Sequence, residues 1–396
     1  MTNGRRTMVG VTLAAAVAFA LPPWSAVAQA QLDFYSAAGI NLAAYKSGAL
    51  LRSQPMPGAP ANAHAYRILY RSTGLRGEAI AVSGVIIVPN GPPPPGGRPI
   101  VAWAHPTTGI VDRCAPSRAR AFFQSVQGLR DMLDRGYAIA ATDYPGLGTS
   151  DVHPYLVGDS EGKAVIDSVR AARFIPGVGS GHSFAVWGHS QGGQAALFTG
   201  LLATSYAPEL NLVGVAAAAP ATDLRKLMIE DIDTSGGRNI TAMTLWSWSR
   251  VYDAPMADVV MPQAIPVINQ LANDCIERFF DVLLRRGPTR ALARSFLKVN
   301  DFADRQPWRS LLERNTPGPL SPRIPVFLAQ GTTDNLVLPS ITLAYRSKLC
   351  RSGSPVDMMM LPNIGHLMIA RKAAPATVAW IADRFNGRPA PSNCRG

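Results

Sequence analysis

One serine stands in a context that suits nucleophilic catalysis. Gly188, His189, Ser190, Gln191 and Gly192 form a G-x-S-x-G run that directly follows the apolar segment FAVW and directly precedes the helical segment QAALFTGLL. A sharp turn from strand to helix strains the serine and leaves no room for Cβ atoms at its flanks, so glycines are needed there. The turn presents the hydroxyl at the carboxyl edge of a sheet. We therefore predict a catalytic serine at Ser190, the alternative being a chance glycine-rich turn.

A serine hydroxyl is a poor nucleophile and needs a base to accept its proton and an acid to orient that base. Of the six histidines, His366 in LPNIGHLM follows the last apolar run, while the others lie in other motifs or loops. Two carboxylates suit the acid, because Asp334 in QGTTDNLVLP and Asp223 in ATDL both follow apolar runs. We favour Asp334, since an N-capping role at a helix start explains Asp223 fully.

The negative charge that develops on a carbonyl oxygen during acyl transfer needs two backbone N–H donors. Gln191, directly after the serine, is expected to supply one. The other should come from the loop after the third predicted strand, which reads HPTTG. Pro106 has no N–H, so we expect Thr107 to be the second donor, with Thr108 as the alternative. His105 in the same loop fits a buried structural histidine better than a proton carrier.

Alternating apolar and helical segments predict the elements that position these residues. Segments 65–72 and 80–89 are rich in β-branched and aromatic residues and suggest an antiparallel pair. Nearly continuous apolar runs follow at 100–105, 137–144, 184–190, 212–220, 324–331 and 356–362. Helical patterns separate most of them, at 119–135, 159–174, 191–204, 338–349 and 372–385. This alternation is typical of an α/β fold with a mostly parallel central sheet flanked by helices.

The interval between the sixth predicted strand, which ends at Pro220, and the seventh breaks this alternation. It holds no buried strand, and its amphipathic helical patterns lie at 223–230, 239–252, 263–284 and 288–299. Loops of this length are uncommon, so we expect a helical cap at 222–318, inserted into a core formed by 31–221 and 319–396. Because ligands bind beyond the carboxyl ends of such strands, the cap should cover the serine. Trp246 and Phe280 are expected to line an acyl pocket, although the helical spacing of Trp246 with nearby aromatic residues also suits a core.

Composition and the first residues indicate an exported globular protein. The chain has 396 residues, of which 47% are hydrophobic, enough for a large core. Its 38 basic and 26 acidic residues give a net charge of +12, but no basic run interleaved with aromatic residues predicts nucleic-acid binding. Residues 1–30 combine a basic start, an uncharged stretch and small residues before position 30, as a cleaved export signal does. The pair Arg5-Arg6 also suits a twin-arginine signal.

The four cysteines, Cys114, Cys275, Cys350 and Cys394, are far apart and contain no CxxC pair. This spacing disfavours zinc and suits disulfides in an oxidising compartment. Of the three pairings we choose Cys114 with Cys275, which would tether the cap to the core, and Cys350 with Cys394, which would anchor the tail. The mature protein should therefore be secreted or periplasmic.

Several segments together resemble the secretory lipase family of α/β-hydrolases, which includes the lipase A-type enzymes of yeasts. They are RILYRSTGLRGEAIAVSGVIIVP, AWAHPTTGIVDRCAPS, DYPGLGTSDVHPYL and GHSQGG, with the Asp334 and His366 pair. The resemblance covers essentially the mature chain. It implies an α/β-hydrolase fold with a helical cap inserted after the sixth strand, catalysis by Ser190, Asp334 and His366, and an oxyanion hole at Gln191 and Thr107. It also supports the Cys114 and Cys275 pair. The alanine- and arginine-rich composition suggests a bacterial member.

These observations predict a secreted serine ester hydrolase, a lipase or carboxylesterase that cleaves acylglycerols or related carboxylic esters through an acyl-enzyme. The chemistry needs no metal and no cofactor. The expected partners are small-molecule or lipid esters, with transient contact to a lipid interface. The alternatives are an acyltransferase or a serine peptidase on the same scaffold, for which the cap acids Glu230, Asp231 and Asp233 could anchor a peptide terminus. A non-catalytic binding protein of this fold would typically lack a triad member.

Overall fold

The computed structural model describes residues 1–2, 34–179, 181–276 and 286–394. The chain falls into two compact units, Met1–Phe34 and Tyr35–Gly396. The first unit consists almost entirely of residues outside the described ranges, and so does the predicted export signal at 1–30. The sheet and the helices described below all lie in the second unit.

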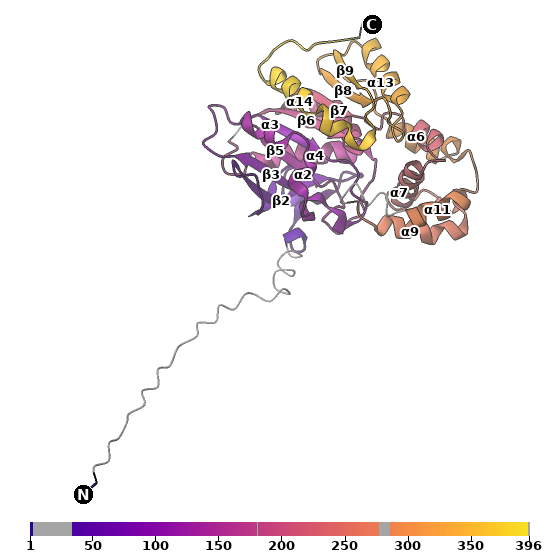
Figure 1. The fold of residues 1–396 in the computed structure, drawn as a ribbon, viewed down its shortest axis with the longest axis horizontal. Coiled ribbons are helices and arrows are strands. Elements are labelled where there is room, and N and C mark those ends of the chain that lie inside the picture. Colours follow the sequence, from indigo (N-terminus) through magenta and orange to yellow (C-terminus); the bar gives the residue numbers. More distant parts are fainter. Residues whose placement is uncertain (3–33, 180, 277–285, 395–396) are drawn as a thin grey trace. The chain divides into compact units, whose positions relative to one another are not determined.

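A mixed sheet forms the centre of this unit (Figure 1). In the described residues its nine strands have the order β1-β2-β3-β5-β4-β6-β7-β8-β9. The strands are β1 (Leu50–Pro55), β2 (Ala63–Thr73), β3 (Ala79–Pro89), β4 (Ile100–Ala104), β5 (Ala138–Thr142), β6 (Ser183–His189), β7 (Asn211–Ala218), β8 (Val326–Gly331) and β9 (Val356–Leu361). Pairing is antiparallel from β1 to β5 and parallel from β5 to β9. The predicted mostly parallel sheet is thus confirmed.

The central strands of the sheet are buried on both faces, because their residues alternate between two apolar layers. Along β4, Val101 and Trp103 belong to the same apolar cluster as residues of α3 and α14, whereas Ile100 and Ala102 belong to a second cluster with residues of α4, α5 and α13. These helices are α3 (Leu129–Asp134), α4 (Gly158–Ala172), α5 (Gln191–Tyr206), α13 (Pro339–Arg351) and α14 (His366–Phe385). This two-sided burial explains why the parallel strands read as continuous apolar runs.

Three local features differ from the sequence prediction. The edge strand β1 was not predicted, because its residues LLRSQP are half-exposed and carry no clear alternation. The helix predicted at 119–135 is divided into α2 (Phe122–Ser125) and α3, because Gly128 takes a left-handed φ of +80° between them. Helix α14 begins at His366 rather than at 372.

Between β7 and β8 the described residues form helices and one isolated bridge, Val260 with Leu297. The α-helices are α6 (Leu224–Glu230), α7 (Ser235–Val251), α8 (Met256–Val259), α9 (Ile265–Asn273), α11 (Arg286–Arg294) and α12 (Trp308–Arg314). Figure 1 shows α6, α7, α9 and α11 grouped beside the sheet. Part of the helix predicted at 263–284 lies outside the described residues. We keep the boundaries 222–318 for this helical segment as a proposal.

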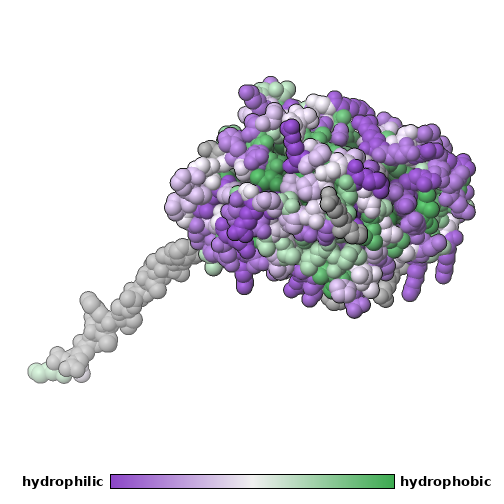
Figure 2. Space-filling view, turned by 90° about the horizontal axis from the view of Figure 1, so that it is seen from above, coloured by the Kyte–Doolittle hydropathy of each residue, from purple (hydrophilic) through white to green (hydrophobic). Residues whose placement is uncertain are grey.

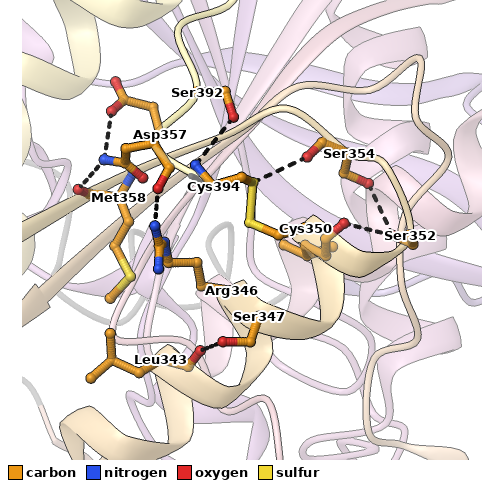
Figure 3. The surroundings of a disulfide bond; sticks show 12 residues. Leu343, Arg346, Ser347, Cys350, Ser352, Ser354, Asp357, Met358, Ser392 and Cys394 are labelled. Atoms are coloured by element: carbon orange, nitrogen blue, oxygen red, sulfur yellow. Dashed lines mark hydrogen bonds between the residues drawn. A yellow bond between two sulfur atoms is a disulfide. The ribbon is translucent and has the colours of Figure 1, made fainter. Parts of the chain in front are cut away.

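Two disulfides join segments that are distant in sequence. Cys114 bonds to Cys275, which connects the loop after β4 to the end of α9. Cys350 of α13 bonds to Cys394, and Figure 3 shows the tail held there beside α13 and β9. Backbone and side chain of Asn393 add hydrogen bonds to Val356 and Met358 of β9. These are the pairings chosen from the sequence.

The surface of this unit is mixed in character. Figure 2 shows hydrophilic residues over most of one face, with smaller hydrophobic areas between them. Within the ranges that the structure describes, no helix has the length and apolar character needed to cross a bilayer.

Candidate active site

The predicted nucleophile occupies a strained turn between β6 and α5. Ser190 has φ +57° and ψ −119°, a conformation that L-residues rarely adopt. A Cβ atom on Gly188 would lie 2.0 Å from the carbonyl oxygen of Gly192, and one on Gly192 would lie 2.0 Å from that of Ala104. Both glycines are therefore required by the close approach of backbone segments at the turn, as the G-x-S-x-G pattern predicts.

A hydrogen-bonded chain connects the serine to a histidine and an acid. The Oγ of Ser190 lies 2.8 Å from Nε2 of His366, and Nδ1 of the same ring lies 2.8 Å from Oδ2 of Asp334. The three residues follow β6, β9 and β8, so their meeting results from the parallel arrangement of these strands. All three are buried, Ser190 being 9% exposed. Most of the charge rearrangement in such a chain would occur away from bulk water.

The surroundings of Asp334 favour its ionised form. Its Oδ1 accepts the backbone N–H groups of Leu336 and Val337, both at 2.9 Å, and its Oδ2 accepts the Gln330 side-chain amide at 3.1 Å. Burial raises the pKa of Asp334, but His366 and these N–H donors together outweigh it, so the pKa is lowered overall. An ionised Asp334 accepts a hydrogen bond from Nδ1–H of His366 and leaves Nε2 free to accept the serine proton.

The competing acid does not join this chain. Asp223 is the N-cap of α6, where its Oδ1 accepts the backbone N–H of Lys226 at 3.0 Å. His189, which the sequence placed only as a motif residue, contacts the predicted base: its Nε2 lies 3.0 Å from the backbone oxygen of His366. Burial, assisted by the neighbouring His366, lowers the pKa of His189 to about 3, so the ring is neutral and donates to that carbonyl.

The two expected oxyanion donors belong to different elements. Gln191 is the first residue of α5, and the first N–H groups of a helix lack intrahelical acceptors. Thr107 lies in the segment after β4, and its Oγ1 is 2.9 Å from the hydroxyl of Tyr155. Nδ1 of His105 lies 2.7 Å from the carbonyl oxygen of Pro106 and Nε2 lies 3.2 Å from that of Asp143. Burial lowers the pKa of His105 to about 4, so the neutral ring donates its single N–H to one of these carbonyls. These contacts fit the structural role expected for His105.

Of the two expected pocket residues, Trp246 and Phe280, the structure describes only Trp246. Trp246 is half-buried on α7, donates to Oδ1 of Asn269 at 3.1 Å and lies under the guanidinium of Arg250. Among the described residues these contacts belong to the helical segment itself and none reaches Ser190. Phe280 lies outside the described residues. The roles of both in substrate binding stay proposals.

A further acid from the helical segment interacts electrostatically with this site. Asp231, directly after α6, is only 2% exposed. Burial raises its pKa to about 7, and the charges of Glu230 and Asp334 add to the increase while His366 opposes it. The carboxyl of Asp231 is therefore only partly ionised at neutral pH.

Known proteins resemble this chain over most of its length. The sequence pattern of the secretory lipase family matches residues 125–393, which include Ser190, Asp334 and His366. Lipase 6 of Candida albicans is 25% identical over 403 residues, covering 92% of this chain and 83% of that protein. A protein of Mycobacterium tuberculosis named as a probable inactive lipase is 26% identical, covering 86% of this chain and 79% of that protein.

Solved structures share the fold at lower sequence identity. The closed state of Candida antarctica lipase A has a TM-score of 0.75 at 20% identity, covering 89% of this chain and 87% of that chain. A rice cell wall degrading esterase from Xanthomonas oryzae has a TM-score of 0.71 at 20% identity, covering 87% of this chain and 100% of that chain. The predicted α/β-hydrolase fold is thereby confirmed. Because the family pattern spans well over half of the sequence, the chain belongs to the secretory lipase family.

Proposed function

We propose that this protein is a secreted serine hydrolase that cleaves carboxylic esters through an acyl-enzyme. The observation that carries the proposal is the buried chain from Ser190 through His366 to Asp334, with both hydrogen bonds at 2.8 Å. Membership of the secretory lipase family supports an ester as the substrate. This chemistry uses only side chains and backbone groups of the protein.

In the proposed reaction the Ser190 hydroxyl attacks the ester carbonyl while His366 Nε2 takes its proton. The oxygen of the tetrahedral intermediate gains a negative charge, which the backbone N–H groups of Gln191 and Thr107 stabilise. The imidazolium then protonates the leaving alcohol, and water repeats the sequence to release the acid. Asp334 keeps the imidazole in the correct tautomer and stabilises its charged form.

The acyl chain of the substrate is proposed to lie under the helical segment 222–318. This segment leaves the sheet at the carboxyl end of β7, and ligands of such sheets bind at that edge. Each CH₂ group of an acyl chain that is buried contributes up to about 0.8 kcal/mol, a factor of about 4 in affinity. Leu367 and Met368, which directly follow His366, are 45% and 37% exposed and would provide apolar contact to a lipid interface.

Ester preference decides between a lipase and a short-chain esterase. We would measure kcat/KM on p-nitrophenyl esters from two to sixteen acyl carbons, and on emulsified triacylglycerol. An increase over several carbons followed by a plateau is expected. Trp246→Ala should lower kcat/KM on long esters more than on acetate, whereas Phe174→Ala, at a side chain 67% exposed just after α4, should change neither. A flat or falling profile would identify a short-chain esterase.

Two other reactions share the same acyl-enzyme and differ only in the group that attacks it. A peptidase would cleave aminoacyl amides, and an acyltransferase would give mainly ester when an alcohol competes with water. Membership of the secretory lipase family favours the ester hydrolase. Running both assays beside the ester series tests this choice.

Export is proposed to follow cleavage of a signal within residues 1–30, to the periplasm or the medium. The two disulfides and the family support this location. N-terminal sequencing of the mature protein should find a start after Ala28 or Ala30. Replacing Arg5 and Arg6 by lysine should block export only if the twin-arginine route is used.

A further inference from the structure

A closed polar cluster lies beneath the first turn of α5, next to the proposed nucleophile. Its members are Glu161 of α4, Gln191 of α5 and His153 of the loop between β5 and α4, all at most 2% exposed. The side-chain nitrogen of Gln191 donates to Oε1 of Glu161 at 2.8 Å and lies 3.1 Å from Nε2 of His153. Oε1 of Glu161 also accepts the backbone N–H of Leu156 at 3.0 Å.

The donors and acceptors of this cluster can be assigned from its geometry. Nδ1 of His153 lies 2.8 Å from the carbonyl oxygen of Pro145, so it carries the ring proton and Nε2 is an acceptor. Burial lowers the pKa of His153 to about 3, which keeps the ring neutral. The two hydrogens on the Gln191 amide nitrogen are therefore directed to His153 and to Glu161, and the orientation of this amide is fixed.

Two buried oxygens are left over in this arrangement. Oε2 of Glu161 and Oε1 of Gln191 have no hydrogen-bond partner among the described residues. If Glu161 were ionised, the site would hold a buried negative charge and two oxygen acceptors without a further donor. The free energy of desolvating these groups would then be large and uncompensated. A protonated Glu161 removes the charge and places one O–H donor on Oε2.

The other neighbours of Glu161 do not offer a compensating positive charge. The titratable groups that interact with Glu161 itself are His153 and Tyr144. The elements packed around the cluster add Tyr70 of β2, His105 after β4 and Tyr155 in the loop before α4, with uncharged side chains from α5 and α7. None of these groups is a cation at neutral pH, since His105 is neutral like His153. Burial accordingly raises the pKa of Glu161 to about 8, against the smaller effects of its donors.

We propose that Glu161 is a positioning residue of the oxyanion hole. It holds the Gln191 side chain and thereby fixes the first turn of α5, from which the Gln191 backbone N–H is directed at the reacting oxygen beside Ser190. Glu161 performs this role as a neutral carboxylic acid. The inference rests on the proposed function, because it assigns Glu161 to the hole that stabilises the tetrahedral intermediate.

The same cluster also reaches the second proposed donor. The stretch that gives the Leu156 N–H to Glu161 includes Tyr155, whose hydroxyl is 2.9 Å from Oγ1 of Thr107. Helix α7 holds the segment 153–156 by two hydrogen bonds to its backbone. Ser247 donates to the His153 carbonyl at 2.6 Å, and Trp248 donates to the Tyr155 carbonyl at 2.8 Å. Loss of the proton from Glu161 would therefore disturb both sides of the hole.

The test compares the pH dependence of kcat and KM in the wild type and three variants. Glu161→Gln keeps one oxygen acceptor and places two N–H donors on the other atom, but it cannot ionise. Glu161→Leu removes both, and Glu313→Gln, at an exposed acid of α12, is the matched control. Hydrolysis by Ser190→Ala, measured at each pH, is subtracted as background.

We expect the kcat of the wild type and of Glu313→Gln to fall above about pH 8 with a single ionisation. Glu161→Gln should keep kcat within about threefold at pH 7 and show no fall up to pH 9.5. Glu161→Leu should lower kcat about 10- to 100-fold with KM little changed, because oxyanion donors act mainly in the transition state. An alkaline fall that persists in Glu161→Gln, or a Glu161→Leu effect confined to KM or stability, would overturn the proposal.

The rate at which a fluorophosphonate labels Ser190 gives a second readout, because the phosphoryl oxygen enters the same hole. If the wild type cleaves no ester but its labelling rate falls above about pH 8 and that of Glu161→Gln does not, the ester hydrolase proposal fails while the role of Glu161 stands. If esters are cleaved and neither kcat nor labelling distinguishes the two proteins at alkaline pH, the role of Glu161 is wrong and the function stands.

Discussion

Gly192 holds the proposed nucleophile against the strand that carries the oxyanion loop, so adding one methyl group there should damage catalysis. In Gly192→Ala the new Cβ would lie 2.0 Å from the carbonyl oxygen of Ala104, 2.5 Å from its carbon and 2.6 Å from the carbonyl oxygen of His105. Every one of these atoms is backbone. Relief of the contact therefore requires movement of α5 or of the end of β4, and not a side-chain rotation.

The size of the effect follows from this overlap. Non-bonded heavy atoms in contact lie about 3.5 Å apart, so the two segments must separate by more than about 1 Å. Overpacking of this kind costs roughly 1–3 kcal/mol of the free energy of unfolding. A displacement of about 1 Å between Ser190 and the 105–109 loop should lower kcat/KM by about 10²-fold. Most of that loss should appear in kcat.

Steady-state kinetics on p-nitrophenyl butyrate and urea denaturation measure both quantities. Gly318→Ala is the matched control, because a Cβ atom there meets nothing within 4 Å, and it should behave as the wild type. Gly193→Ala should give an intermediate loss, since its Cβ would lie 2.9 Å from Pro220 and away from β4. Wild-type kcat/KM in a folded Gly192→Ala would refute the argument that this close approach sets the geometry of the site.

Three further changes test the catalytic acid, one disulfide and the ionisation of Glu161. Asp334→Asn should lower kcat by about 10⁴-fold, because the His366 tautomer would be wrong. Asp223→Asn should lower kcat at most a few-fold. The reverse ranking of the two variants in steady-state kinetics would identify Asp223 as the acid. Serine at both Cys114 and Cys275 removes a disulfide between residues separated by 161 positions. Chain entropy sets an upper value of about 5 kcal/mol for the resulting loss in the free energy of unfolding. An unchanged midpoint of urea denaturation would show that this disulfide does not stabilise the fold. The pKa of Glu161 is about 8 in the folded protein and 4.5 when unperturbed, so its contribution to stability is complete below pH 4.5 and is lost as the pH rises to about 8. In that window the free energy of unfolding of the wild type should fall by about 1.4 kcal/mol per pH unit relative to that of Glu161→Gln. Parallel curves of unfolding free energy against pH would contradict this.

The fold and the central residues of the site could be predicted because strand and site signals coincide along the chain. Ser190, Asp334 and His366 each follow a continuous apolar run, and parallel pairing of β6 to β9 brings the ends of those runs together. Edge strand β1 lacked such a signal because it is half-exposed. The break between α2 and α3 depends on the single left-handed residue Gly128, which a helical pattern does not reveal.

The cluster around Glu161 could not be predicted in the same way, because His153, Glu161 and Gln191 come from three elements and meet only in the folded chain. One sequence signal was available. Glu161 precedes Ala164 and Val165 by three and four residues, which places an acid on the buried face of α4. Such an acid must be paired or neutral.

Covalent labelling shows whether Ser190 is the nucleophile. The folded protein would be treated with a fluorophosphonate at pH 7, and the modified residue identified by mass spectrometry beside Ser190→Ala. We expect one adduct per chain, on Ser190, with loss of ester hydrolysis in proportion to labelling and no adduct in the variant. Hydrolysis that survives in Ser190→Ala, or a wild type that is folded and remains unlabelled, would contradict the proposal that this serine is the nucleophile.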